Sequence, residues 1–382
     1  MPKTSGGTRC IALISAHAGT FVSFRAPLIQ ALHAQRVRVL ALAPNFDETS
    51  RTAVRALGAE PIDSPMARTG MNPWVDMRNT WRLAGLLRRL QPDVTLGYMV
   101  KPVIFGSIAA RLARVPRRVA MVEGLGYVFT PSSNMLSLRR RLLKRVVQRL
   151  YRIGMGCAHQ VIFLNPDDQH EFVQMGLVPS HKTLVLGGIG VDLAQWPVLP
   201  QPAATAPFTF LMVARLLREK GVAEYAAAAR LVRAQHPQAR FVLLGGLDDN
   251  PGSVSQAEVE AWHTAGVIEW QGHTAVQPWL EQAHVFVLPS YREGVPMSTQ
   301  EAMASGRAII STDTPGCRET VEQGENGFLV PVRDVQTLAA AMLRFITEPA
   351  LAQRMGEASR RMAEAKYDVH QVNARMLQAL SL

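Results

Sequence analysis

Short, continuously apolar runs alternate with helical stretches along this chain, and this alternation constrains the fold more than any other feature. The runs expected as strands are residues 10–16, 37–43, 94–99, 119–122, 159–164 and 184–186 in the first half, and 208–213, 240–244, 267–270, 285–288, 308–311 and 327–330 in the second. Strands that are apolar on both faces and separated by helices form parallel sheets with helices on each side. The sequence therefore predicts an α/β fold of two Rossmann-like domains that face each other across a cleft.

The domain boundaries follow from the length and from one proline-rich stretch. A chain of 382 residues is long enough for two or three domains of about 150 residues each. We expect an N-terminal domain over residues 1–190, a C-terminal domain over 191–365, and a final helix, 366–382, that crosses back to the N-terminal domain. Residues 196–207 hold four prolines among small residues, a composition typical of a linker.

Cysteine usage and hydropathy indicate a cytoplasmic protein. The three cysteines, Cys10, Cys157 and Cys317, lie far apart without the spacing of a zinc site, so no disulfide framework is expected. No stretch reaches the roughly 18 apolar residues that a membrane-spanning helix needs. The first apolar run follows Lys3 and Arg9, as in a signal peptide, but it is too short for one. We interpret it as the first buried strand.

Positive charge is concentrated in the first half of the chain. The net charge is +11, and residues 1–190 carry 25 Lys and Arg against 10 Asp and Glu, a net of +15. The other 192 residues carry 16 against 20, a net of −4. The two halves are therefore expected to face different partners, with nucleic acid, anionic lipid and a phosphorylated substrate all open at this point.

A predicted amphipathic helix over residues 138–152 supplies much of this charge. Its expected apolar arc contains Leu138, Leu142, Leu143, Val146, Val147 and Leu150, and its basic arc contains Arg140, Arg141, Lys144, Arg145, Arg149 and Arg152. The helix could simply pack on its own domain with a charged solvent face, or that face could lie on anionic lipid, and the two interpretations are compatible. Nucleic-acid binding is disfavoured because no recognised module or aromatic interleaving accompanies the charge.

In parallel sheets, ligands bind at the carboxyl ends of the strands, so the turns there are candidate sites. Gly19 lies in the turn after the first strand, before a helix expected to begin near Ser23. A glycine lets the backbone approach a ligand and a helix N-terminus favours an anion, although a tight turn without a ligand explains the segment equally well. The sequence has neither a GxGxxG nor a GxxxxGK[ST] motif, which disfavours nicotinamide-dependent oxidoreductases and P-loop NTPases.

The second half holds a more specific constellation. Arg215 and Lys220 follow the strand at 208–213, where two cations beside free backbone N–H groups would suit a diphosphate. The alternative is a solvated basic turn. Glu293 lies on a Gly/Pro turn after the strand at 285–288, and Glu301 lies eight residues later in the next helix. These two carboxylates could address the two ends of one extended ligand.

These motifs resemble those of a known family. The Arg-x4-Lys at Arg215 and Lys220, the Glu-x7-Glu at Glu293 and Glu301, the runs at 301–306 and 324–330, and Gly-Val-Asp at 190–192 resemble retaining GT-B glycosyltransferases of family GT4. The resemblance covers roughly residues 10–375. Residues 68–73, Lys101-Pro102 and 124–129 resemble a narrower bacterial subgroup. That subgroup includes N-acetylgalactosaminyl- and galactosyltransferases that elongate sugars on undecaprenyl diphosphate.

The resemblance implies a role for each matching residue. Arg215 and Lys220 would bind the diphosphate of a UDP-sugar donor, Glu301 the ribose, and Glu293 the sugar hydroxyls. The other donor-side residues implied are Gly294, Val295 and Pro296 around the sugar, Ser298 and Thr299 at the phosphates, Gly19 facing the diphosphate, and His273 at the nucleobase. The residues expected on the acceptor and membrane side are Arg68, Asn72, Lys101, Arg140, Arg141, Lys144 and Arg145.

One position departs from the family. Many relatives have a histidine just before the glycine of the turn after the strand at 119–122, and this chain has Glu123 there. Glu123 could serve in catalysis by orienting an acceptor hydroxyl instead. A carboxylate that faces a diphosphate sugar costs free energy unless it is protonated or paired.

We expect neither a metal nor another cofactor. The chain lacks the Asp-x-Asp of metal-dependent transferases, and the adjacent pairs Asp167-Asp168 and Asp248-Asp249 are interpreted as loop or helix-cap residues. The sequence thus predicts metal-independent, retaining transfer of a hexose or N-acetylhexosamine to a lipid-diphosphate-linked glycan at the inner face of the plasma membrane. The alternatives are a GT4 transferase with a soluble acceptor, a nucleotide-sugar 2-epimerase of the same fold, and a non-catalytic basic membrane- or nucleic-acid-binding protein.

Overall fold

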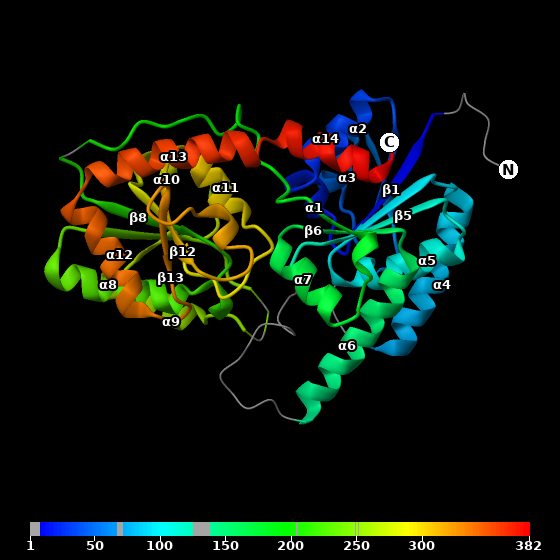
Figure 1. Ribbon diagram of the computed structural model, residues 1–382, viewed down its shortest axis with the longest axis horizontal. Helices are drawn as coiled ribbons and strands as arrows, with labels where there is room; N and C mark the ends of the chain where they lie inside the picture. The colour runs from blue at the N-terminus through cyan, green and yellow to red at the C-terminus, as the bar shows by residue number, and fades with distance from the viewer. Residues whose placement is uncertain (1–7, 67–71, 125–137, 204, 249, 251) are drawn as a thin grey trace. The chain divides into compact units, whose positions relative to one another are not determined.

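The computed structural model of the protein describes residues 8–66, 72–124, 138–203, 205–248, 250 and 252–382, with residues 138–144 described by their backbone alone (Figure 1). The chain divides into two compact units. The first consists of Met1–Leu186 with Gln371–Leu382, and the second of Gly187–His370. The predicted boundary after residue 190 therefore lies four residues too late, and residues 366–370 belong to the second unit rather than the first.

The first unit is built on a parallel sheet. Within the described residues its strands have the order β3-β2-β1-β4-β5-β6-β7. Their bounds are β1 (Cys10–Ile14), β2 (Arg38–Ala43), β3 (Ala59–Asp63), β4 (Val94–Tyr98), β5 (Arg117–Val122), β6 (Gln160–Phe163) and β7 (Thr183–Val185). The helices are α1 (Gly19–Ser23), α2 (Ala26–Ala34), α3 (Glu48–Ala56), α4 (Pro73–Leu90), the π-helical turn η1 (Pro102–Gly106), α5 (Ser107–Leu112), α6 (Leu138–Cys157), α7 (Pro166–Gln174) and the 3-10 turn η2 (Ser180–Lys182).

The strand order determines which helices share a face of this sheet. The chain moves from β1 outward to β2 and β3, then returns past β1 to β4 and continues to β7. Because parallel crossovers are right-handed, this reversal puts α1–α3 on one face and α4–α7 on the other. Figure 1 shows α4, α5 and α6 together on one side of the sheet, and the close packing of α5 against both α4 and α6 agrees with it.

The second unit repeats this architecture. Its described strands have the order β10-β9-β8-β11-β12-β13, all parallel. The strands are β8 (Thr209–Val213), β9 (Arg240–Leu244), β10 (Glu269–Trp270), β11 (Val285–Leu288), β12 (Ala308–Thr312) and β13 (Gly327–Val330). The helices are η3 (Arg218–Lys220), α8 (Val222–Gln235), α9 (Gln256–Thr264), α10 (Gln277–Gln282), α11 (Met297–Ala304), η4 (Arg318–Thr320), α12 (Val335–Thr347) and α13 (Ala350–Lys366). The last helix, α14 (Val369–Leu380), belongs to the first unit from Gln371 onward.

The predicted strands are all present, with ends that differ by a few residues, and one strand was missed. β3 contains Pro61 and partly exposed side chains, because it lies at the edge of its sheet. An edge strand lacks the continuous apolar run that identifies a central one. The helix expected near Ser23 was also misplaced: α1 begins at Gly19 and ends at Ser23, and α2 begins at Ala26.

The proline-rich stretch at 196–207 is not a linker between the units, so that prediction is wrong. It belongs wholly to the second unit. Its backbone is held by the loop after α11, where Leu199 N donates to Ser305 O at 3.2 Å, and by the buried Arg307, whose Nη2 donates to Pro200 O at 2.8 Å. Proline composition marks an irregular segment, but only these tertiary contacts decide whether that segment is free.

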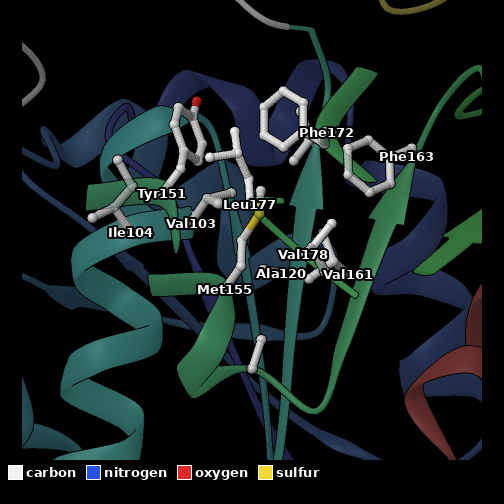
Figure 2. Close-up of a cluster of buried hydrophobic side chains, with 12 residues drawn as sticks. Val103, Ile104, Ala120, Tyr151, Met155, Val161, Phe163, Phe172, Leu177 and Val178 are labelled. Atoms are coloured by element: carbon white, nitrogen blue, oxygen red, sulfur yellow. The ribbon is translucent and has the colours of Figure 1, made fainter. Parts of the chain in front are cut away.

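The core beside α6 shows how this helix is fixed to the sheet (Figure 2). Tyr151 packs edge-to-face on Phe172 with ring centroids 5.3 Å apart, and Phe172 contacts Phe163 of β6 at the same distance. A Cβ at Gly154 would lie 2.6 Å from Ile104 Cα, so only glycine permits this approach to η1. The predicted apolar arc is wrong at Val146, which is 48% exposed. No described helix of the chain has the length and apolarity needed to cross a bilayer.

Candidate functional site

The carboxyl ends of β8 and β11 form the centre of the candidate site in the second unit. These two strands are neighbours in the sheet, with Val285 opposite Phe210. The chain leaves β8 toward β9 and leaves β11 toward β12, so the strand order reverses between them. In open parallel sheets, the crevice at such a reversal is where ligands bind.

Two predicted residues meet at this reversal. Lys220 ends η3, which follows β8, and Glu293 lies in the loop that follows β11. Lys220 Nζ donates to Glu293 Oε1 at 2.5 Å, and the two side chains are only 17% and 12% exposed. A largely desolvated lysine is thus held against a glutamate by a short, charge-assisted hydrogen bond at the carboxyl edge of the sheet.

Arg215 reaches the same edge but has a different partner. Its Nη1 donates to Asp248 Oδ2 at 2.9 Å, and its side chain is 58% exposed. Asp248 lies in the loop after β9 and also accepts from the backbone N–H of Asn250 at 2.9 Å. Asp248 is therefore a loop residue, as one of the two predicted alternatives had it, and its side chain orients a predicted phosphate-binding arginine. Nothing in the local sequence distinguishes this aspartate from an ordinary turn residue.

Two glycines hold the Glu293 loop close to its neighbours. Gly221 has a φ of 75°, and a Cβ there would lie 2.2 Å from Pro289 O. Gly316 has a φ of 77°, and a Cβ there would lie 2.2 Å from Glu293 O. Any larger residue would push apart the segments that carry Lys220 and Glu293, so both positions require glycine.

Tyr291, which the sequence reasoning overlooked, fastens the Glu293 loop to the segment around η3. Its backbone N–H donates to Glu219 O at 2.8 Å, and its hydroxyl donates to Glu224 Oε1 of α8 at 2.5 Å. Burial and the hydrogen bond to Glu224 raise the pKa of the Tyr291 hydroxyl to about 12. Tyr291 therefore stays a neutral donor and fixes Glu293 relative to Lys220.

The N-terminus of α11 is suited to an anion. The helix begins at Met297 after Pro296, and no side chain caps its first turn within the described structure. The backbone N–H groups around Ser298 and Thr299 are therefore left for another acceptor. Val295 and Gly294 before the helix are buried and shape its approach. Free amides and the helix dipole together favour a phosphate here.

Glu301 lies farther along α11, in a partly buried position. Burial raises the pKa of its carboxyl to about 7. A carboxylate in such a site gains most when donors such as ligand hydroxyls approach it, because they replace the lost water. Its chemical setting thus differs from that of Glu293, which has Lys220 as a permanent partner.

His273 completes this edge of the second sheet. It is exposed just after β10, and a Cβ at Gly246 would lie 3.6 Å from His273 Cβ. Gly246 O in turn accepts from the backbone N–H of Leu216, next to Arg215, at 3.2 Å. The structure therefore brings His273, Arg215, Lys220 and Glu293 to the carboxyl edge of one sheet.

In the first unit, Glu123 has a partner that the sequence reasoning missed. It follows β5 directly and forms an ion pair with Arg25, which is 2% exposed. The Arg25 guanidinium lies 4.6 Å above the ring centroid of Tyr98, and the Tyr98 hydroxyl lies 3.1 Å from Thr20 Oγ1. Burial raises the pKa of the Glu123 carboxyl, and the charge of Arg25 opposes that rise. The pairing removes much of the cost expected for an isolated carboxylate at this place.

Gly19 and the Arg25–Glu123 pair lie at the corresponding edge of the first sheet. The strand order of that sheet reverses between β1 and β4. Gly19 begins α1 just after β1, and a Cβ there would lie 2.9 Å from His17 Cε1. Thr20 of α1 and Tyr98 at the end of β4 connect the two sides of this reversal. The first unit therefore has its own cluster of polar groups where a ligand is expected.

The other predicted acceptor-side residues fare differently. Asn72 caps α4 by accepting from the backbone N–H groups of Trp74 and Val75, and Lys101 pairs with the buried Asp76 at 2.7 Å. Arg145 is exposed on α6. Arg68, the motif at 124–129 beyond Gly124, and the side chains of Arg140, Arg141 and Lys144 lie outside the described residues. Among the side chains that are described, no three His, Cys, Asp or Glu converge as a metal site would require.

Comparisons with known proteins place this geometry among characterised families. Residues 23–188 match the family described as "Glycosyl transferase 4-like domain", and residues 200–362 match "Glycosyl transferases group 1". The chain is 31% identical over 335 residues to N,N'-diacetylbacillosaminyl-diphospho-undecaprenol alpha-1,3-N-acetylgalactosaminyltransferase of Campylobacter jejuni, which covers 85% of this chain and 86% of that protein.

Two further proteins extend the comparison. The Escherichia coli UDP-Gal:alpha-D-GlcNAc-diphosphoundecaprenol alpha-1,3-galactosyltransferase is 27% identical over 72% of both chains. The crystal structure of Anabaena HepE in complex with UDP and glucose has a TM-score of 0.76 and 19% identity, covering 98% of this chain and 99% of that one. At that identity the structural likeness shows the fold, which agrees with the predicted pair of Rossmann-like domains.

Proposed function

This chain belongs to the GT4-type glycosyltransferases of GT-B fold, and we propose that it moves a hexose or N-acetylhexosamine from a UDP-sugar to a saccharide on undecaprenyl diphosphate, with retention of configuration. The observation that carries the proposal is the contact of Lys220 with Glu293 at the strand-order reversal, beside Arg215 and the uncapped start of α11. This arrangement offers cations and amides to a diphosphate and carboxylates to hydroxyl groups.

The donor half of the reaction follows from these groups. The barrier to transfer falls when the charge that develops on the leaving diphosphate meets preorganised cations and helix amides. Arg215, Lys220 and the first turn of α11 would supply them, while Glu301 would accept hydrogen bonds from the ribose. Glu293 would accept from the sugar hydroxyls, and its pair with Lys220 would hold the sugar in line with the phosphate that departs. None of these steps calls for a metal ion.

The acceptor half draws on the first unit. The two transferases compared above are named for acceptors that are diphosphoundecaprenol-linked, which supports the same carrier here. Glu123, held by Arg25, would orient the acceptor hydroxyl. The product would enter a bacterial glycan, such as a protein-linked glycan, a capsule or an O-antigen.

The lipid carrier implies work at the inner face of the plasma membrane. Exposed basic residues on α6, namely Arg145, Arg149 and Arg152, support peripheral binding to anionic headgroups. Such attraction is electrostatic, so it should weaken as salt shortens the Debye length from about 10 Å at 0.1 M to about 3 Å at 1 M.

The decisive experiment measures UDP release from a panel of nucleotide sugars, with and without a polyprenyl-diphosphate-linked saccharide, in the presence of a chelator. We expect one UDP-sugar to give rapid release that depends on the acceptor and survives chelation. Release that ignores the lipid-linked acceptor would favour a soluble acceptor or epimerase chemistry. No release from any nucleotide sugar would favour a non-catalytic protein.

A further inference from the structure

Helix α4 exposes a stripe of large apolar side chains that the site does not use. Trp74, Met77 and Trp81 are 75%, 49% and 56% exposed, which places them among the most exposed large apolar residues described. They are spaced three and four residues apart, so they share one face of the helix. The opposite face, which includes Leu83 and Leu87, is buried against the unit's core. The stripe is therefore additional to the apolar face that folding requires.

A row of arginines runs beside this stripe. Arg78, Arg82 and Arg89 are exposed. Their spacings of four and seven residues place them on one face of the helix, next to the face of the apolar stripe. The single acidic residue of α4, Asp76, is buried against Lys101. Every charge that α4 presents to solvent is consequently positive.

The stripe begins at the edge of the sheet where the substrates are expected. Asp76, in the first turn of α4, is bound by Lys101, which lies just after β4. The carboxyl end of β4 also carries Tyr98, part of the cluster around Glu123. Trp74 is thus near the carboxyl edge of the first sheet, where the substrates are expected. The helix runs from there toward the opposite edge of the sheet (Figure 1).

We propose that α4 is a bilayer-docking helix that inserts Trp74, Met77 and Trp81 among the headgroups of an anionic membrane, with the arginine row on lipid phosphates. Tryptophan prefers the membrane interface because its ring is apolar and its N–H still needs a polar partner. An apolar stripe beside a purely cationic row is the pattern of interfacial helices. A second protein surface would not require that every exposed charge be positive.

This inference deepens the proposed function and rests on it, because a lipid-linked acceptor is the reason for a transferase to sit on a bilayer. It also differs from the electrostatic role of α6. Charge attraction fades in high salt, whereas burial of apolar side chains does not. Binding that persists in high salt is therefore the signature of α4.

The test is sedimentation with vesicles of phosphatidylglycerol and phosphatidylcholine that contain no acceptor, at 0.1 M and 1 M salt. Wild type should bind at both. The triple variant Trp74→Ser, Met77→Ser, Trp81→Ser should lose at least tenfold in affinity at 1 M salt. A matched control, Val198→Ser with Val332→Ser, removes exposed apolar residues of the second unit and should bind as wild type does. Arg78→Glu with Arg82→Glu should lose affinity mainly at 0.1 M salt.

A second measurement locates the tryptophans. Fluorescence should be quenched by brominated lipids in wild type and much less in Trp74→Phe with Trp81→Phe, although four other tryptophans remain. Quenching that does not change in this variant, or a Ser variant that sediments as wild type at 1 M salt, would overturn the proposal. So would a Ser variant that merely changes a dimer into a monomer in analytical ultracentrifugation, since the stripe would then join two copies.

The two proposals can fail separately. If wild type docks on plain vesicles through α4 but transfers no sugar, the proposed function fails and the docking helix stands. If wild type glycosylates a bilayer-embedded acceptor but the Ser variant does so equally well and binds vesicles normally, the docking helix fails. With both proposals correct, the Ser variant should keep its activity on a water-soluble short-chain acceptor and lose at least fivefold on the embedded one.

Discussion

The two units use the same architecture but hold their functional side chains differently. In the second unit, Lys220 and Glu293 come from the ends of neighbouring strands and contact each other, and glycines and Tyr291 fix the loops that carry them. In the first unit, several expected acceptor residues, such as Asn72 and Lys101, are engaged in the fold itself. The proposed donor side is thus held in place by contacts between the ends of neighbouring strands, whereas the residues proposed for the acceptor side take part in the scaffold of the first unit.

Removal of Lys220 should produce the largest loss of activity, and it is the most direct test of the difference between the two units. Lys220→Ala takes away a cation proposed to bind the leaving diphosphate. It also leaves the largely buried Glu293 carboxylate without its ion-pair partner. We expect kcat/KM to fall by about 10²- to 10³-fold, or about 3–4 kcal/mol. Arg215→Ala should cost less, because that side chain is more exposed. Arg218→Ala, which removes the neighbouring Arg218–Glu258 pair, is the matched control and should stay near wild type. Near-normal turnover of folded Lys220→Ala would remove the diphosphate assignment.

The free energy of unfolding of the unliganded protein should depend on pH because the Glu301 carboxyl is buried. Its folded-state pKa of about 7 lies above the unfolded value of 4.5, so the native state keeps an extra proton between those pH values. The free energy of unfolding should therefore fall as the pH rises from about 4.5 to about 7, by about 3 kcal/mol in all.

Glu301→Gln removes that dependence. Without ligand, the variant should be more stable than wild type at pH 8 and about equal at pH 4, as measured by urea denaturation. If the free energy of unfolding depended on pH in the same way for wild type and variant, Glu301 would be solvated in the folded protein, and its burial could not favour ligand binding.

In the first unit, the Arg25–Glu123 pair offers the corresponding test. Arg25→Met should destabilise the protein by about 2 kcal/mol, because it leaves Glu123 as an uncompensated carboxylate. Adding Glu123→Gln should restore most of that loss, as thermal unfolding would show. If Glu123→Gln alone also lowers turnover while leaving UDP binding intact, Glu123 acts on the acceptor. A double variant no more stable than Arg25→Met would mean that the pair is not coupled.

Calorimetry with UDP should separate the two glutamates of the second unit. Glu301→Gln should weaken UDP binding by about 1–2 kcal/mol, since a charged acceptor for hydroxyl groups is lost. Glu293→Gln should leave UDP binding nearly intact and lower turnover with the sugar donor. Hydrogen bonds from a ligand favour the ionised Glu301, so wild-type affinity should decline from pH 8 to pH 6 more steeply than that of Glu301→Gln. Equal losses in both variants would contradict the separate roles.

The smallest effect is expected on α6. Arg145→Glu with Arg149→Glu should weaken binding to anionic vesicles at 0.1 M salt, by about 1 kcal/mol for each basic residue lost. The difference should vanish at 1 M salt, in contrast to the α4 apolar variant. Binding of UDP should not change, because the residues proposed to bind the donor belong to the other unit. Reversal of all of Arg140, Arg141, Lys144 and Arg145 should weaken sedimentation at low salt further and leave the binding that α4 provides.

Local sequence patterns were sufficient to predict most strands of this protein and the positions of its motifs. Parallel strands buried on both faces are continuous in the sequence, so twelve of the described strands could be found from apolar runs. The donor motifs are also local, because in a strand–turn–helix unit the residues after a strand necessarily lie at its carboxyl end. The sequence alone therefore assigns Arg215, Lys220, Glu293 and Glu301 to one edge of a sheet. The edge strand β3 lacked that pattern and was missed.

Only the tertiary structure decides which charged side chains pair, because strand crossovers bring together residues that lie far apart in the chain. Lys220 meets Glu293 73 residues later, Arg215 meets Asp248 33 residues later, and Arg25 meets Glu123 98 residues later. The same holds for solvent exposure: residues 196–207 and Val146 were misjudged because composition and helical periodicity do not say what packs against a segment. Burial and pairing, which set the charge state of Glu123 and Glu301, belong to the folded chain and not to its motifs.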